Sequence, residues 1–207
     1  MDKDKEQQAR RADILRRIQG LRLMDDNFMT RVLENRDCAQ LVIRLVLDRP
    51  DLKVGESRTQ YAIKNLQGRS VQLDIFARDA EGKKINVEIQ RDDRGAGAKR
   101  ARYHASLIDA NTSEPGENLE NLLDTYVIFI TEHDLYGKGI AVYHIDPIVR
   151  ETGELFVDGQ HILYVNGACE DGSAVGKLME DFRTTEPEKM HYKLLADEVS
   201  FYKRDQK

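Results

Sequence analysis

The spacing of hydrophobic and polar positions changes along the chain. As far as residue 49 the apolar residues recur at helical spacing, which predicts a helical arm over residues 1–23 and a helical region from Asp25 or Asp26 to just before Pro50. From Lys53 onward apolar and polar residues alternate, which predicts strands. The alternating segments are TQYAIKN, SVQLDIFA and KINVEIQ, with turns in NLQGRS and DAEGK between them.

The rest of the chain adds a helix and further strands. A helix is expected over AKRARYHASLIDAN and a buried strand over TYVIFIT, followed by strands in GIAVYHI and HILYVNG and a helical part from Ala174. The predicted fold class is therefore α/β. Residues 24–207 are expected to form one domain, with an αβββαβ core over about 24–132 and extra strands and helices over 133–207.

Composition narrows the class of protein. Of the 207 residues, 40% are hydrophobic and 33% are charged, as in a folded domain that buries a core without disulfides. The sequence has no apolar run that would span a bilayer and no hydrophobic signal region, so we expect a cytoplasmic protein. Cys38 and Cys169 are far apart, which argues against a disulfide framework or a thiolate zinc site. The formal net charge of −5 means that any binding of nucleic acid depends on a local basic patch.

The second and third predicted strands form an antiparallel hairpin if the chain turns about Glu81, where Gly82 can adopt the positive φ of a short turn. The resulting register places apolar residues opposite one another on one face, as a fixed pairing requires. On the other face Asp74 lies directly opposite Glu88, and Gln90 follows on the same side. The three apolar pairs are Leu73–Ile89, Ile75–Val87 and Ala77–Ile85.

The opposed carboxylates of Asp74 and Glu88 are the main chemical signal in the sequence. Directly opposed side chains on neighbouring strands have Cβ atoms about 5 Å apart, so two ionised carboxylates there repel each other. A divalent cation bound by oxygen atoms at about 2.0–2.1 Å fits between them. Acidic residues on the outer face of a hairpin are usually just solvated. Here the helix that follows the hairpin is expected to cover one face of the sheet, which would leave the carboxylates near the mouth of a packed site.

Basic residues follow the third strand closely. A helix beginning near Gly97 would present free backbone N–H groups beside arginine and lysine side chains, an arrangement that can hold a phosphate. The alternative is a solvated helix face with Asp92 and Asp93 as partial counter-charges. GAGAKR is not a dinucleotide-binding loop or a P-loop, because Arg100 occupies the third glycine position and no G-K-[ST] follows. The candidate DNA-binding residues are Arg91, Arg94, Lys99, Arg100, Arg102 and Tyr103.

The order of elements, together with D…E-x-Q on the hairpin, resembles the PD-(D/E)XK nuclease core, the restriction-endonuclease-like mixed sheet flanked by helices. More closely, Asp74, Glu88 and Gln90, with GAGAKRARYHASLIDAN and the tail GKLMEDFRTTEP, are similar to the Rpn family of recombination-promoting nucleases and transposases over about residues 22–203. Two positions depart from the pattern that gives the PD-(D/E)XK superfamily its name: Leu73 replaces the proline, and Gln90 replaces the usual lysine, which is a common variant among Rpn-like sequences. Glutamine cannot lower the pKa of a water molecule with a positive charge, so water activation would rest more heavily on the metal.

The resemblance implies a DNA endonuclease that depends on Mg²⁺ or Mn²⁺ and serves recombination or transposition. Asp74 and Glu88 would ligate the metal through their carboxylates, and Ile89 through its backbone carbonyl. Lys99, from the following helix, would partly substitute for the missing lysine. Asp26 fits the acidic residue that recurs on the first core helix of this superfamily, with Asp25 as the second choice, although both also suit helix capping. Many nucleases with this core cut two strands as dimers, so a homodimer is a further partner to consider.

Two other functions remain open on the sequence alone. A protein of this fold could bind nucleic acid without useful catalysis, which Gln90 and the acidic net charge would favour. It could also be a protein-interaction module that uses the strands only as a scaffold, and such a module would not bind DNA even at low salt. Metal-dependent DNA cleavage that is lost on substitution of Asp74 or Glu88 would exclude both alternatives.

Overall fold

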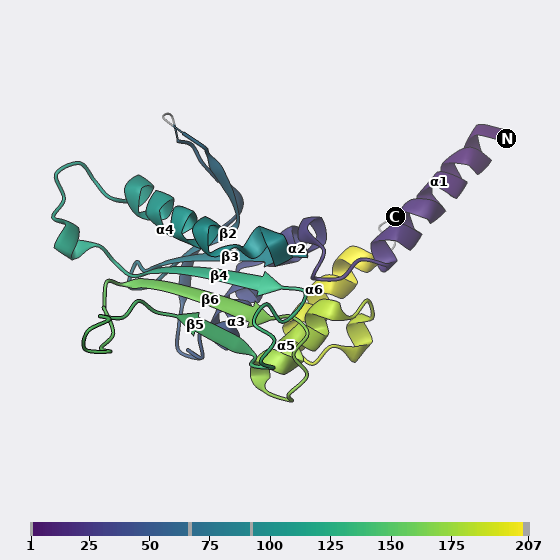
Figure 1. Cartoon of the computed structure of the whole chain (residues 1–207). Helices are drawn as coiled ribbons and strands as arrows, with labels where there is room; N and C mark the ends of the chain where they lie inside the picture. The colour runs from purple at the N-terminus through teal and green to yellow at the C-terminus, as the bar shows by residue number, and fades with distance from the viewer. Residues whose placement is uncertain (1, 66–67, 92, 205–207) are drawn as a thin grey trace.

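The computed structural model describes residues 2–65, 68–91 and 93–204. Within these ranges the chain forms a mixed six-stranded sheet with helices on both faces (Figure 1). The α/β class and the order of a helical region, three strands, a helix and a strand are confirmed. The elements are α1 (Asp2–Gln19), α2 (Asp26–Leu33), α3 (Arg36–Val46), β1 (Val54–Ile63), β2 (Val71–Asp79), β3 (Lys84–Gln90), α4 (Ala98–Thr112), β4 (Thr125–Thr131), β5 (Val142–Ile145), β6 (Gln160–Asn166), α5 (Ala174–Arg183) and α6 (Lys193–Lys203), with 3-10 turns η1 (Asp93–Ala96), η2 (Leu119–Asn121) and η3 (Pro187–Lys189).

The sheet has parallel strands at its centre and antiparallel strands at its edges. Its strand order is β1-β2-β3-β4-β6-β5, in which β3, β4 and β6 run parallel. The outer pairs β1–β2, β2–β3 and β5–β6 are antiparallel. A parallel connection needs a crossover of a dozen or more residues, and the segment containing α4 provides it between β3 and β4.

Two hydrophobic clusters, one on each face of the sheet, hold the layers together. Val42 of α3 and Phe182 of α5 belong to the same cluster as Val87 of β3. Ile108 of α4 belongs to the other cluster, together with Phe129 of β4. Central strands that are covered on both faces read as nearly continuous apolar runs, which explains the sequence TYVIFIT of β4. The helix that follows the hairpin therefore covers one face of the sheet, as the sequence predicts.

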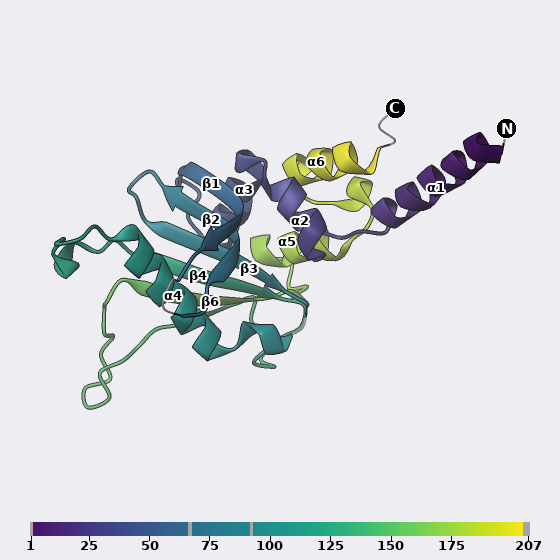
Figure 2. The ribbon, with the colours of Figure 1, turned by 90° about the horizontal axis from the view of Figure 1, so that it is seen from above.

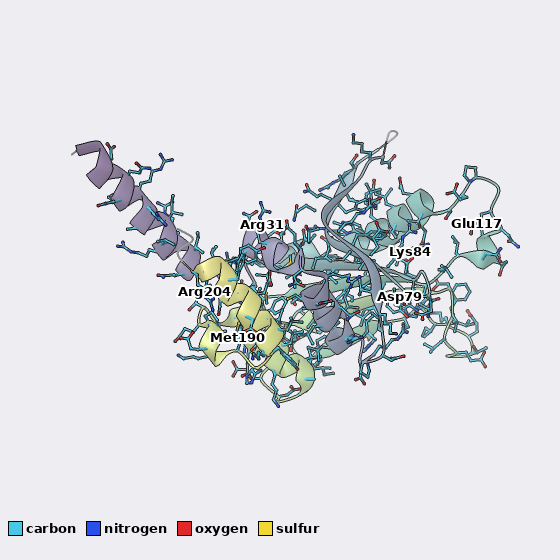
Figure 3. The ribbon with its side chains drawn as sticks, turned by 180° about the vertical axis from the view of Figure 1, so that it is seen from behind. Arg31, Asp79, Lys84, Glu117, Met190 and Arg204 are labelled. Carbon is cyan, nitrogen blue, oxygen red and sulfur yellow. The ribbon has the colours of Figure 1, made fainter. Side chains whose placement is uncertain are left out.

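The β2–β3 hairpin has the predicted register from the pair Ile75–Val87 to the turn. Gly82 adopts a φ of 86°, so the expected use of glycine at this turn is confirmed. The carboxylate of Asp79 accepts hydrogen bonds from two backbone N–H groups of the turn, at 3.1 and 2.8 Å. Asp79 and Lys84 mark this end of the hairpin in Figure 3, and the opposed carboxylates lie at the other end.

The pairing of β2 with β3 ends at Ile75–Val87, and the predicted pair Leu73–Ile89 is not part of the ladder. β2 pairs with β1 along its whole length, and beyond this point the β1–β2 hairpin rises away from the sheet on the side of α4 (Figure 1). Leu73 consequently packs in the cluster on the α4 side, whereas Ile75 belongs to the opposite cluster. The prediction of one continuous apolar face was wrong at Leu73, because the two strands separate there.

Helix α1 projects from the body as an arm (Figures 1 and 2). Its end is tied to α6, because the Nζ of Lys203 donates hydrogen bonds to the carbonyl oxygens of Gln19, at 3.0 Å, and Leu21, at 2.6 Å. None of the helices in the described part of the chain, α1 included, is long and apolar enough to cross a membrane.

Candidate active site

Asp74 and Glu88 lie where β2 and β3 separate, and their side chains replace the missing ladder hydrogen bonds. The N–H of Asp74 donates to Oε1 of Glu88 at 3.3 Å. The N–H of Ile89 donates to Oδ2 of Asp74 at 3.0 Å. Each carboxylate is therefore fixed by the backbone of the other strand. The hydrogen bonds bring the two carboxylates together in the fork between the strands, on the side of α4.

Burial raises the pKa of both carboxyl groups. Glu88 is fully buried, and burial together with the negative charge of Asp74 raises the pKa of Glu88. Burial also raises the pKa of Asp74, to about 6, with a smaller contribution from the charge of Asp26, while the hydrogen bond from Ile89 opposes the rise. Two neighbouring carboxyl groups that both resist ionisation form a site that a cation would stabilise.

The guanidinium of Arg100, from the first turn of α4, reaches into the same fork. Its Nη2 lies 2.9 Å from Oε2 of Glu88, and its Nη1 donates to Oε1 of Gln90 at 3.1 Å. Nη1 also donates to the carbonyl oxygen of Gly95 at 3.2 Å, and Nε donates to Nε2 of His104 at 3.3 Å. The guanidinium thus bridges the glutamate and the glutamine of the hairpin.

His104, one turn further along α4, is a buried and neutral member of the site. Burial, together with the charge of Arg100, lowers the pKa of His104 to about 4. Its Nε2 accepts a hydrogen bond from an arginine, which is always a donor, so the proton of the neutral ring is on Nδ1. Nδ1 lies 3.6 Å from Oε1 of Glu88 and 3.4 Å from the side-chain nitrogen of the buried Asn86.

The backbone carbonyl of Ile89 points toward the same fork. Backbone groups of successive residues in a strand alternate between its two neighbours. The carbonyl of Gln90 accepts a hydrogen bond from Glu132, just past β4, so the groups of Ile89 face the other way, toward β2. The N–H of Ile89, which bonds Asp74, agrees with this direction. The fork therefore offers two carboxylates and one backbone carbonyl.

This set of oxygen atoms fits a hard divalent cation. In the described part of the chain no group of three or more His, Cys, Asp and Glu side chains is arranged to hold a metal ion. Mg²⁺ is commonly bound by one or two carboxylates and otherwise by water and substrate phosphates, so two carboxylates and a carbonyl suffice for it. A zinc site would need more side-chain ligands than these.

A comparison with known protein families identifies the family of this chain. The profile of the family described as PD-(D/E)XK nuclease family transposase matches residues 52–167, more than half of the chain. The chain belongs to this family. No curated protein and no solved structure gives a significant match. The matched region runs from just before β1 to the end of β6 and so contains the whole fork between β2 and β3.

The acidic residues at the start of α2 lie beside this nuclease-family fork. Asp25 occupies the N-cap position, but its side chain makes no capping hydrogen bond. Instead its Oδ1 lies 2.8 Å from Nη1 of Arg91, and its Oδ2 accepts the N–H of Arg22 at 2.8 Å. Asp26 is the first residue of α2, and it lies near enough for its charge to raise the pKa of Asp74. Of the two acidic residues, Asp26 is thus the one whose charge acts on the fork.

The residue expected to replace the family's lysine was Lys99, but the structure places Arg100 at the carboxylates instead. Lys99 is exposed, and it lines a hollow of about 510 Å³ outside the fork. A signal for Arg100 was present in the sequence, because Arg100 and His104 are four residues apart and lie on one side of a helix. The hollow is lined by Arg69, Ser70, Val71, Gln72, Lys99, Arg100, Tyr103 and His104.

Of the other candidate DNA-binding residues, Tyr103 lines this hollow, whereas Arg91 lines a separate one beside Asp25 and Asp26. Arg102 is exposed on α4. The hydroxyl of Tyr103 donates to the carbonyl oxygen of Arg69 and so ties α4 to the end of the β1–β2 hairpin. Arg91 is paired with Asp25 and with Glu132, whose Oε2 lies 3.4 Å from the Arg91 Nε. The side chain of Arg94 lies outside the described residues.

Proposed function

We propose that the protein is a metal-dependent DNA endonuclease that acts in recombination or transposition. The observation that carries the proposal is the fork, in which Asp74 and Glu88 hold each other across two separating strands. Beside it lies the hollow that contains Arg69, Lys99 and Arg100. A site of paired carboxylates next to a basic hollow suits a phosphodiester, whose negative phosphate needs cations on one side and a held water molecule on the other.

The reaction would be hydrolysis. A bond forms between a water oxygen and phosphorus, one phosphorus–oxygen ester bond breaks, the water loses a proton and the leaving oxygen gains one. Asp74, Glu88 and the carbonyl of Ile89 would hold Mg²⁺ or Mn²⁺, which supplies polarisation of the phosphate and a more acidic water molecule. The hydrogen bonds from Ile89 and Asp74 keep the carboxylates oriented, so the site is organised before the substrate arrives.

The proposal is tested with supercoiled plasmid and the full chain in Mg²⁺, in Mn²⁺ and in EDTA. Nicking or linearisation is expected with either metal and not with EDTA. Asp74→Asn and Glu88→Gln should each lower the rate by more than about a hundredfold, since even indirect partners of metal ligands are worth about 10–100-fold. Glu81→Gln, in the exposed turn of the same hairpin, is the matched control and should cleave like the wild type. Cleavage that survives EDTA, or that survives both substitutions in the fork, would refute the assignment.

A second candidate function is nucleic-acid binding without effective cleavage. The observation that favours it is the contact between Arg100 and Glu88, because the guanidinium occupies one oxygen of a proposed metal ligand. Retardation of DNA that does not change with metal, without nicking in Mg²⁺ or Mn²⁺, would support this function.

A further inference from the structure

We infer that Arg100 supplies the positive charge that the lysine of the general PD-(D/E)XK motif would carry and that Gln90 cannot supply. The inference rests on the proposed nuclease function and adds to it a residue from a different element, α4. Arg100 is expected to contact a phosphate oxygen of DNA while it remains in contact with Glu88 and Gln90. Lys99, the neighbouring cation, is exposed and is not expected to supply this charge beside Glu88 and Gln90.

The position of the guanidinium is the first argument. It lies between Oε2 of Glu88, at 2.9 Å, and Oε1 of Gln90, at 3.1 Å. A lysine at position 90 would end near the same place, because its side chain starts from the same backbone and points to the same side of β3. The charge is therefore present in the site, although it is carried by another residue.

The anchoring of Arg100 is the second argument. Gly95 and His104 each accept a hydrogen bond from it, and its guanidinium carbon lies 5.9 Å from the centre of the Phe129 ring. A Cβ at Gly95 would clash with Oε1 of Gln90, so a glycine at this position allows the glutamine and the arginine to meet. A side chain held by this many partners is preorganised, as a group that stabilises a developing charge needs to be.

The hydrogen-bonding capacity of Arg100 is the third argument. A guanidinium has five N–H donors, and the contacts with described residues engage four of them: one on Nε, two on Nη1 and one on Nη2. Within the described part of the chain, one N–H of Nη2 is left for a substrate oxygen. The side chain is 37% exposed and also lines the basic hollow, so a phosphate can reach this donor. Since arginine does not lose its proton, the role is electrostatic and not acid–base.

The test moves the positive charge from position 100 on α4 to position 90 on β3. Cleavage at saturating DNA is measured for Arg100→Gln, for the double variant Gln90→Lys/Arg100→Gln, and for Arg150→Gln, an exposed arginine in a distant loop. DNA affinity is measured separately by fluorescence anisotropy in EDTA. Removing a preorganised donor costs about 10²–10³-fold in rate, so Arg100→Gln should lose about a hundredfold in kcat with a much smaller change in affinity. The double variant should regain at least about tenfold, and Arg150→Gln should match the wild type.

Each result has a defined meaning. A wild type that does not cleave in any metal refutes the proposed nuclease, and the inference falls with it. A wild type that cleaves while Arg100→Gln cleaves equally well, or a folded double variant without any recovery, overturns the inference and leaves the nuclease proposal standing. Thermal unfolding of each variant accompanies the assays. If Arg100→Gln does not fold, Arg100→Met takes its place: it removes the charge but keeps an apolar stem, and it should also lose about a hundredfold in rate, and a folded Arg100→Met that cleaves like the wild type overturns the inference.

Discussion

Replacing Asp74 with asparagine is expected to stabilise the metal-free protein at pH 8. Asparagine keeps the size of the side chain and an oxygen that can accept the N–H of Ile89, but it removes a charge that is held in a poorly solvated place beside a second carboxylate. Folded proteins generally lose stability when a polar contact is altered. An increase in the free energy of unfolding would therefore be a specific sign of stored electrostatic repulsion.

The size of this increase in the free energy of unfolding follows from the pKa of Asp74, which is raised from 3.8 to about 6. Folding thus makes this carboxyl hold its proton more tightly than the unfolded chain does. The stability that the bound proton of Asp74 contributes to the folded state is complete below about pH 4 and is lost as the pH rises through about 6. One pKa unit corresponds to about 1.4 kcal/mol, which sets an upper limit of about 3 kcal/mol at pH 8. Because the amide of asparagine must also be desolvated, we expect a gain of about 2 kcal/mol, or about 4–8 °C in Tm for a chain of this size.

The assay is thermal unfolding followed by circular dichroism in EDTA at pH 8 and at pH 5. Asp74→Asn should melt above the wild type at pH 8, and the difference should shrink at pH 5, where the wild-type carboxyl is mostly protonated. Added Mn²⁺ should raise the Tm of the wild type but not that of Asp74→Asn, since a ligand stabilises only the state that binds it. Glu81→Gln should show none of these effects. The reasoning is refuted if Asp74→Asn melts below the wild type at pH 8, or if its gain is the same at both pH values.

Two further predictions concern the surface and the arm. Lys99→Gln and Arg102→Gln, both on the exposed side of α4, should each weaken DNA binding. In anisotropy titrations each should reduce the slope of log Kd against log salt concentration by about 1, the value for one lost phosphate contact. An unchanged slope would show that DNA binds elsewhere. Lys203→Met should lower the free energy of unfolding by about 2 kcal/mol, because it leaves the carbonyl oxygens of Gln19, Leu21 and Thr185 without the Nζ donor. A Tm equal to that of the wild type would contradict the prediction that Lys203 stabilises the end of the arm.

The register of the hairpin was predictable because period-two alternation in two adjacent segments leaves one pairing that buries every apolar side chain. The same pairing predicts that Asp74 and Glu88 lie opposite each other. The end of the ladder was not predictable in the same way. It depends on side-chain carboxylates that take the place of backbone hydrogen bonds, and on a β1–β2 hairpin that leaves the sheet toward α4. Leu73 was misplaced for this reason.

The choice between Lys99 and Arg100 illustrates a second limit. The two residues are adjacent, and a helix turns by about 100° per residue, so a small error in the expected start of α4 exchanges their directions. The apolar positions of the helix do settle the question once they are considered together. Ala101, Ala105 and Ile108 are buried, which turns His104 and Arg100 inward and leaves Lys99 exposed.

The fork between β2 and β3 has a consequence for how this sheet can change. Apolar residues in place of Asp74 and Glu88 would remove the side chains that accept backbone N–H groups here in place of ladder hydrogen bonds, which would favour continued pairing of the strands toward Leu73 and Ile89. Such a protein would gain backbone hydrogen bonds and lose the pair of carboxylates. A change that favours greater stability at this point of the sheet therefore acts against the candidate site.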